Sequence, residues 1–156
     1  MLTVIGCGNL TRSDDGVGVV VARAVGGALR PEHRRQVSVF DAGTDGMSVM
    51  YRARGASELI IVDASRSGAD PGSIHEVPSG ELEGPPPASF TLHDFRWDHA
   101  LYVGRRIYGE DFPRDTRVFL IEAQDLSYGL QLSACVEQAA VRVAAMILER
   151  IESRVV

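Results

Sequence analysis

Lysine is absent from the chain, and all 16 basic residues are arginines. This absence excludes Schiff-base lysine chemistry, a lysine general base and a Walker-type phosphate loop, which needs its lysine to contact the phosphates. Positive charge is also scarce, because the formal net charge is −5 at pH 7. Nucleic-acid binding draws its main electrostatic support from excess positive charge, so we expect no nucleic-acid partner.

Cysteines and long apolar runs are few as well. The two cysteines, Cys7 and Cys135, lie far apart and form no CxxC pair, which favours a reducing, cytoplasmic setting. No apolar run approaches the ~20 residues that a membrane-spanning helix requires, and none follows the basic segment of a signal peptide. We therefore expect neither secretion nor insertion into a membrane.

The remaining composition is that of an ordinary globular domain. Hydrophobic residues make up 45% and charged residues 24% of the 156 positions, and a chain of this length can bury a substantial core. We expect residues 1–156 to form a single domain, and nothing in the sequence demands more than a monomer.

Short apolar runs alternate with segments of helical spacing along the chain. Expected strands lie at residues 2–6, 36–40, 58–63, 73–77 and 117–121. Expected helices begin near Asp15, span 47–54, run through 100–108, and start after Ser133 as an N-cap. Continuous apolar strands that alternate with helices are typical of a parallel sheet covered on both faces. The sequence therefore predicts an α/β fold, a three-layer αβα sandwich with a mainly parallel, twisted sheet of about five strands.

Two adjacent acids, Asp14 and Asp15, fall where the first strand meets the first helix, in a glycine-rich loop. Sites in open α/β sheets are built at this edge. One aspartate commonly caps a helix, but only one of two adjacent aspartates can be the cap. The loop is not a complete dinucleotide fingerprint, because Thr11 replaces its third glycine, and the acidic pair would repel a pyrophosphate. A nucleotide-binding enzyme is therefore the weaker alternative.

Further acids follow the other predicted strands, namely Asp41, Asp45, Asp63 and Glu122. His93 follows a segment rich in glycine and proline, 79–89, which we interpret as a mobile loop at the edge of the site. We expect Thr91 to cap the helix after that loop, and His33 and His75 to be exposed. Carboxylates and an imidazole at one edge form a donor set that suits nickel, iron, zinc or manganese.

The series of motifs resembles the hydrogenase maturation proteases, endopeptidases that trim the C-terminus of the large subunit of nickel–iron hydrogenases. The matching segments are 6–9 with 14–18, 41–46, 59–64, His93 and 129–133. The resemblance implies that Asp15, Asp63 and His93 contact a metal ion. Asp15 stands at a position that can be glutamate, and its shorter side chain keeps the ligand type.

The resemblance further implies that nickel arrives with the substrate, held by cysteines of the hydrogenase large-subunit precursor. We expect an open, weak metal site in the free protein. Asp15, Asp14, Asp63 and His93 form the expected catalytic set, in which Asp14 either orients Asp15 or acts as the general base. Cys7 is interpreted as a packing residue, because its thiolate would be disfavoured beside two acids. A non-proteolytic nickel-checkpoint or carrier protein with the same three ligands remains the alternative.

Overall fold

A five-stranded sheet forms the centre of the computed structural model, which describes residues 1–88 and 91–154. In sheet order the strands are β2 (Val37–Gly43), β1 (Leu2–Cys7), β3 (Glu58–Ser65), β5 (Asp115–Glu122) and β4 (Ile74–Pro78). The first four are mutually parallel, and β4 pairs antiparallel with β5 at one edge. The prediction of about five mainly parallel strands is confirmed.

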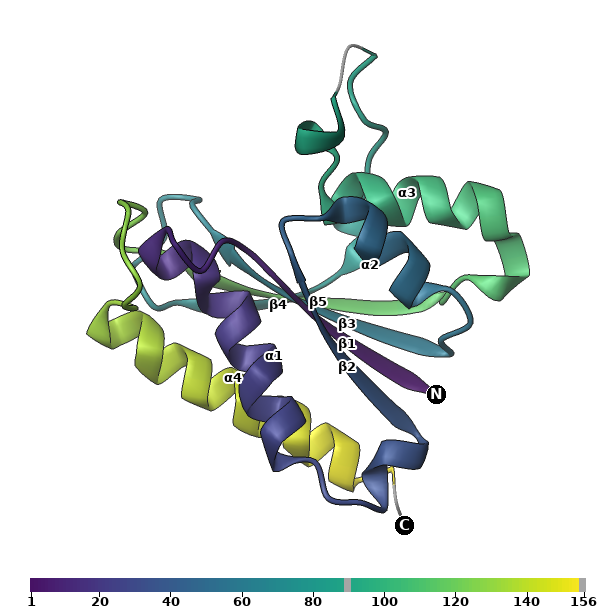
Figure 1. Cartoon of the computed structure of the whole chain (residues 1–156), viewed down its shortest axis with the longest axis horizontal. Helices are drawn as coiled ribbons and strands as arrows, with labels where there is room; N and C mark the ends of the chain where they lie inside the picture. The colour runs from purple at the N-terminus through teal and green to yellow at the C-terminus, as the bar shows by residue number, and fades with distance from the viewer. Residues whose placement is uncertain (89–90, 155–156) are drawn as a thin grey trace.

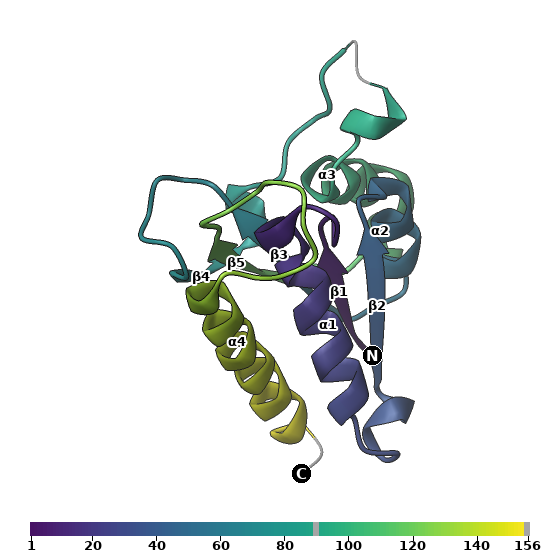
Figure 2. The same cartoon turned by 60° about the vertical axis from the view of Figure 1, so that its left-hand side comes forward.

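Helices cover both faces of the sheet. Helices α1 (Val17–Ala28) and α4 (Ala134–Glu152) lie side by side on one face, and α2 (Gly46–Ala53) and α3 (Trp97–Tyr108) lie on the other (Figure 1). Figure 2, turned by 60°, shows the sheet between these two pairs. The three-layer sandwich predicted from the sequence is confirmed.

The central strand β3 supplies both hydrophobic cores. Ile60 and Val62 pack under α1 and α4, whereas Leu59 and Ile61 pack under α2 and α3, and all four are fully buried. Successive side chains of a strand point to opposite faces, so a strand covered on both faces has a continuous apolar sequence. In the described ranges, no helix combines the length and apolarity needed to cross a lipid bilayer.

Two local expectations differ from the structure. Helix α3 begins at Trp97 with Arg96 as its N-cap, and Thr91 instead donates to the Asp94 carboxylate in a one-turn 3-10 helix. His33 is 1% exposed rather than solvated, because its 3-10 turn places the ring inward with Nε2 3.3 Å from Arg30 Nη2. Ser89, the last residue of the predicted loop, lies outside the described residues.

Candidate active site

A cavity of about 800 Å³ opens at the C-terminal ends of the parallel strands. Asp15, Asp63 and His93 all line it, although they come from three separate segments of the chain. Within the part of the chain that the structure describes, no three or more His, Cys, Asp or Glu side chains are grouped closely enough to hold a metal ion. The three predicted ligands therefore face one space without forming a closed cage.

Asp63 lies near the end of β3 and is 8% exposed. Its Oδ1 accepts the Ala64 N–H at 2.8 Å, and its Oδ2 accepts the Trp97 Nε1–H at 2.8 Å. Burial raises the pKa of Asp63 to about 6, although both hydrogen bonds and Arg96 act to lower it; the charge of Asp15 adds to the rise. Asp63 can therefore exchange a proton near neutral pH. Trp97 was not predicted to contact a site residue.

Asp15 is half-buried, and its Oδ2 accepts the Asn9 N–H at 3.0 Å. This arrangement depends on Gly8, which has φ +130° and whose added Cβ would lie 1.8 Å from the Asp15 carbonyl oxygen. Only glycine allows both the positive φ and the close approach of the two backbone segments. Helix α1 begins at Val17, after a 3-10 turn at Ser13–Gly16, so the expected start near Asp15 is two residues early.

Asp14 is fully buried and does not line the cavity. Its carboxylate accepts the N–H groups of Gln124, Asp125 and Ser133 at 2.7 to 3.0 Å, and the Ser133 hydroxyl at 2.8 Å. Burial alone would raise the pKa of Asp14, but these hydrogen bonds outweigh it and the pKa lies below its usual range. Neither tandem acid caps α1. Ser133 does stand at the N-cap of α4, but its hydroxyl donates to the Asp14 carboxylate and forms no capping hydrogen bond with the helix.

His93 lies in the one-turn 3-10 helix Leu92–Asp94 and is exposed. The connection from β4 to α3 that carries it is anchored at both of its ends. At the α3 end, the Arg96 N–H donates to His99 Nδ1 at 3.2 Å, in a capping box that starts the helix. This hydrogen bond holds the backbone of Arg96, three residues after His93.

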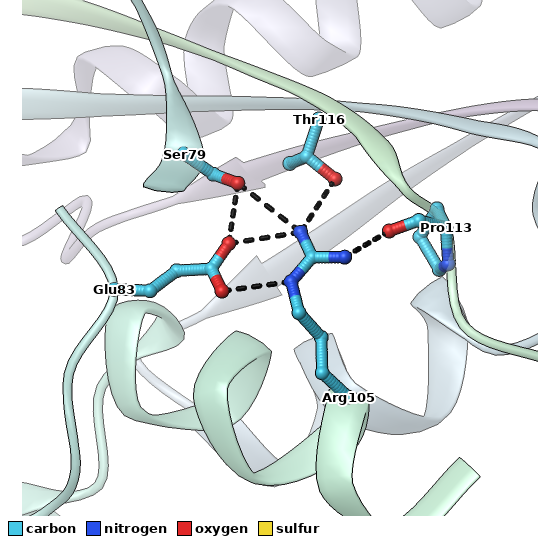
Figure 3. Close-up of polar contacts among 5 residues, drawn as sticks. All are labelled: Ser79, Glu83, Arg105, Pro113 and Thr116. Atoms are coloured by element: carbon cyan, nitrogen blue, oxygen red, sulfur yellow. Dashed lines mark hydrogen bonds and ion pairs between the residues drawn. The ribbon is translucent and has the colours of Figure 1, made fainter. Parts of the chain in front are cut away.

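The anchor at the β4 end is a network around Arg105 of α3 (Figure 3). The Arg105 guanidinium donates to Glu83 at 2.7 and 2.8 Å, to the Ser79 hydroxyl at 3.2 Å and to the Thr116 hydroxyl at 3.3 Å. It also donates to the Pro113 carbonyl, and Ser79 donates to Glu83. The start of the predicted mobile loop is therefore tied to α3 and β5.

The family model for hydrogenase maturation proteases matches residues 20–150. The chain belongs to the hydrogenase maturation protease family. HoxM, a hydrogenase expression/formation protein of Cupriavidus necator, is 32% identical over 77 residues, which are 49% of this chain and 37% of HoxM. The coenzyme F420 hydrogenase subunit delta of Methanothermobacter thermautotrophicus is 30% identical over 103 residues, 60% of this chain and 65% of that protein. The chain thus spans less than two thirds of these relatives.

The fold comparison agrees with the family. The hydrogenase maturating endopeptidase HybD from E. coli matches with a TM-score of 0.79 at 22% identity, over 98% of this chain and 93% of that chain. At this identity the likeness establishes the same fold.

Other acids in this member of the hydrogenase maturation protease family have structural partners. Asp45 caps α2 by accepting the N–H groups of Met47 and Ser48, and Asp41 forms an ion pair with Arg23. Cys7 is 5% exposed and belongs to the core under α2 and α3. Burial raises the pKa of the Cys7 thiol well above its usual range, and the charges of Asp63 and Asp41 raise it further. A thiol held in this protonated state is a poor nucleophile.

Proposed function

We propose that this protein is an endopeptidase that removes the C-terminal extension from the nickel-loaded precursor of a nickel–iron hydrogenase large subunit. The observation that carries the proposal is the common cavity lined by Asp15, Asp63 and His93. Membership of the hydrogenase maturation protease family supports the activity and the class of partner.

The proposed role of these three side chains is to recognise nickel that the precursor already holds. Two carboxylates and one imidazole suit nickel as donors. Since they line an open cavity from three separate segments, they leave room for ligands that the substrate brings. Cysteines that hold nickel must stay reduced, and Cys7 and Cys135 are themselves unpaired. A cytoplasmic site of action is therefore part of the proposal.

Recognition of the ion would place the scissile peptide beside the carboxylates, where a water attacks its carbonyl carbon. A carboxylate within hydrogen-bond reach of that water can accept its proton and pass it to the amide nitrogen, whose bond to the carbonyl carbon then breaks. Asp15 and Asp63 face the cavity and are the candidates for this step. Asp14 has its carboxylate engaged by the loop at 124–133, so we assign it the orienting role, through the turn that carries Asp15.

The test is incubation of the purified protein with nickel-loaded and with nickel-free precursor, followed by mass spectrometry of the precursor. We expect a loss of mass at the C-terminus of the nickel-loaded form only. Asp15→Asn, Asp63→Asn and His93→Ala should each abolish the loss, whereas Asp111→Asn, an exposed acid outside the cavity, should not. A stable stoichiometric complex with no shortened product would instead identify a nickel-checkpoint or carrier protein.

A further inference from the structure

The loop after β3 presents one arginine, Arg66, to the cavity. Arg66 lies three residues beyond Asp63, and it is exposed on the cavity wall with Ser65 and Ser67 on either side. Arg66 therefore lines the same cavity as Asp15, Asp63 and His93.

The backbone that carries Arg66 is fixed by one buried carboxylate. Glu122 ends β5, lies directly opposite Ser65 in the parallel register and is 2% exposed. It accepts the hydroxyls of Ser65 and Ser67 at 2.8 and 2.9 Å, and the N–H groups of Ser67 and Gly68 at 2.7 and 3.0 Å. The residues on both sides of Arg66 are thus bound to the same side chain, so the position of Arg66 is set before any substrate arrives.

The Arg66 side chain itself is unengaged. Among the residues that the structure describes, it has no hydrogen bond, ion pair or ring contact, although Asp15, Asp45 and Asp63 line the same cavity. The two other arginines of the cavity differ: Arg12 donates to the Leu126 carbonyl and lies over the Tyr128 ring, and Arg96 lies 3.7 Å from Asp98. A guanidinium keeps its charge at all working pH values and presents a planar fork of donors that matches a carboxylate. Arg66 is therefore a free anion-binding group on a fixed support.

We propose that Arg66 is a specificity-determining residue that binds a carboxylate of the substrate segment that occupies this cavity. This inference rests on the proposed function, since it is the cleaved segment that would occupy the cavity. The carboxylate is either an acidic side chain or the terminus of the extension.

The experiment compares wild type, Arg66→Gln, Arg66→Lys and the control Arg142→Gln in processing of the nickel-loaded precursor. Arg142 is exposed on α4 and lines no part of the cavity. A hydrogen-bonded charge pair contributes to the binding free energy of the substrate, and its loss at a partly exposed site should raise KM about tenfold. We expect this rise for Arg66→Gln with kcat close to wild type, a partial recovery in Arg66→Lys, and no change in Arg142→Gln.

Two precursor series identify the source of the carboxylate. In one series each acid of the C-terminal region of the precursor is changed to its amide, and in the other the extension is lengthened by three glycines at its C-terminus. The precursor change that removes or displaces the recognised carboxylate should raise the KM of wild type but not the KM of Arg66→Gln. Equal KM values for Arg66→Gln and Arg142→Gln would overturn the proposal. It would also be overturned if every precursor change affected the KM of Arg66→Gln as much as the KM of wild type.

Failure of the proposed function has a different signature. If wild type leaves the nickel-loaded precursor uncut, the peptidase proposal fails, and the dissociation constant of the uncut precursor then decides the role of Arg66. A constant about tenfold weaker for Arg66→Gln than for Arg142→Gln supports carboxylate binding. Equal constants refute it.

Discussion

Replacement of Asp14 separates a structural role in the site from a chemical one. The carboxylate is completely buried, and both of its oxygens accept hydrogen bonds from the loop that precedes α4. Oδ2 accepts the N–H groups of Gln124 and Asp125 at 2.9 and 2.8 Å and the hydroxyl of Ser133 at 2.8 Å, while Oδ1 accepts the Ser133 N–H at 2.7 Å. The Asp14 side chain therefore joins the turn before α1 to the loop before α4, in addition to the hydrogen bonds that Arg12 and Ser13 donate to that loop.

The two informative substitutions differ in what they leave unpaired. In Asp14→Asn, the amide oxygen can take the place of Oδ2 and keep three donors, so that one hydrogen bond and the charge are lost, at a cost of about 2 kcal/mol. In Asp14→Ala all four donors lose their acceptor, and the cost rises to about 4 kcal/mol, because each buried donor left unpaired costs about 1 kcal/mol or more. Domains of this size are stable by only about 5–15 kcal/mol. The alanine variant should therefore lose a substantial share of its stability.

The destabilisation should also depend on pH with a definite sign. The pKa of Asp14 is lower in the folded protein than its usual value, which is about 3.9 in an unfolded chain. The stability that Asp14 contributes is thus fully present above about pH 4 and is lost as the pH falls through the lowered folded pKa. The difference between wild type and Asp14→Asn should be constant near neutral pH and shrink in acid.

Urea unfolding followed by circular dichroism measures these free energies, with Asp111→Asn as the exposed control. Processing of the nickel-loaded precursor is measured on the same samples, at a temperature where each variant is folded. An Asp14→Asn protein as stable as wild type but unable to process would refute the structural role and identify Asp14 as the general base.

Three further predictions concern the supports of the site. Glu122→Gln should lower the free energy of unfolding by about 2 kcal/mol, and hydrogen exchange should show lost protection at residues 67 and 68. Arg105→Met should lower the free energy of unfolding by about 2 kcal/mol. It should also raise KM for the precursor, because the segment that carries His93 loses its contacts to Arg105. Arg105→Lys should recover part of both effects. Gly8→Ala should lower the free energy of unfolding by more than about 3 kcal/mol, because the alanine would have a positive φ and its Cβ would overlap the Asp15 carbonyl. Thermal unfolding measures this loss, and an unchanged midpoint would contradict the assigned geometry.

The layers of this fold follow from local sequence. An eight-residue strand such as β3, buried on both faces, has an apolar run that no surface strand would show, and the buried stripe of α4 repeats at helical spacing. The start of α3 could not be predicted in this way. Its capping box is made by Arg96 and His99 rather than by the usual small polar residues, whereas Thr91, a typical cap by sequence, belongs to a separate turn.

Contacts between distant segments are the part that sequence patterns miss. Asp14 and its partners are 110 to 119 residues apart, and Glu122 reaches the loop at 65–68 only because β3 and β5 pair in one particular register. Both acids follow predicted strands, as Asp63 does, so their place in the sequence does not set them apart. In the folded protein each of them accepts four hydrogen bonds and neither lines the cavity, which distinguishes them from Asp15 and Asp63.

The tandem acids make the distinction clearest, because they are neighbours with identical side chains. They lie in a 3-10 turn, Ser13–Gly16, where successive side chains are rotated by about 120°. One therefore faces the loop before α4 while the next faces the cavity. Exchange of either carboxylate for an amide should consequently have different main effects, with stability lost chiefly at Asp14 and processing lost chiefly at Asp15. Two equal effects would mean that the turn does not separate their roles.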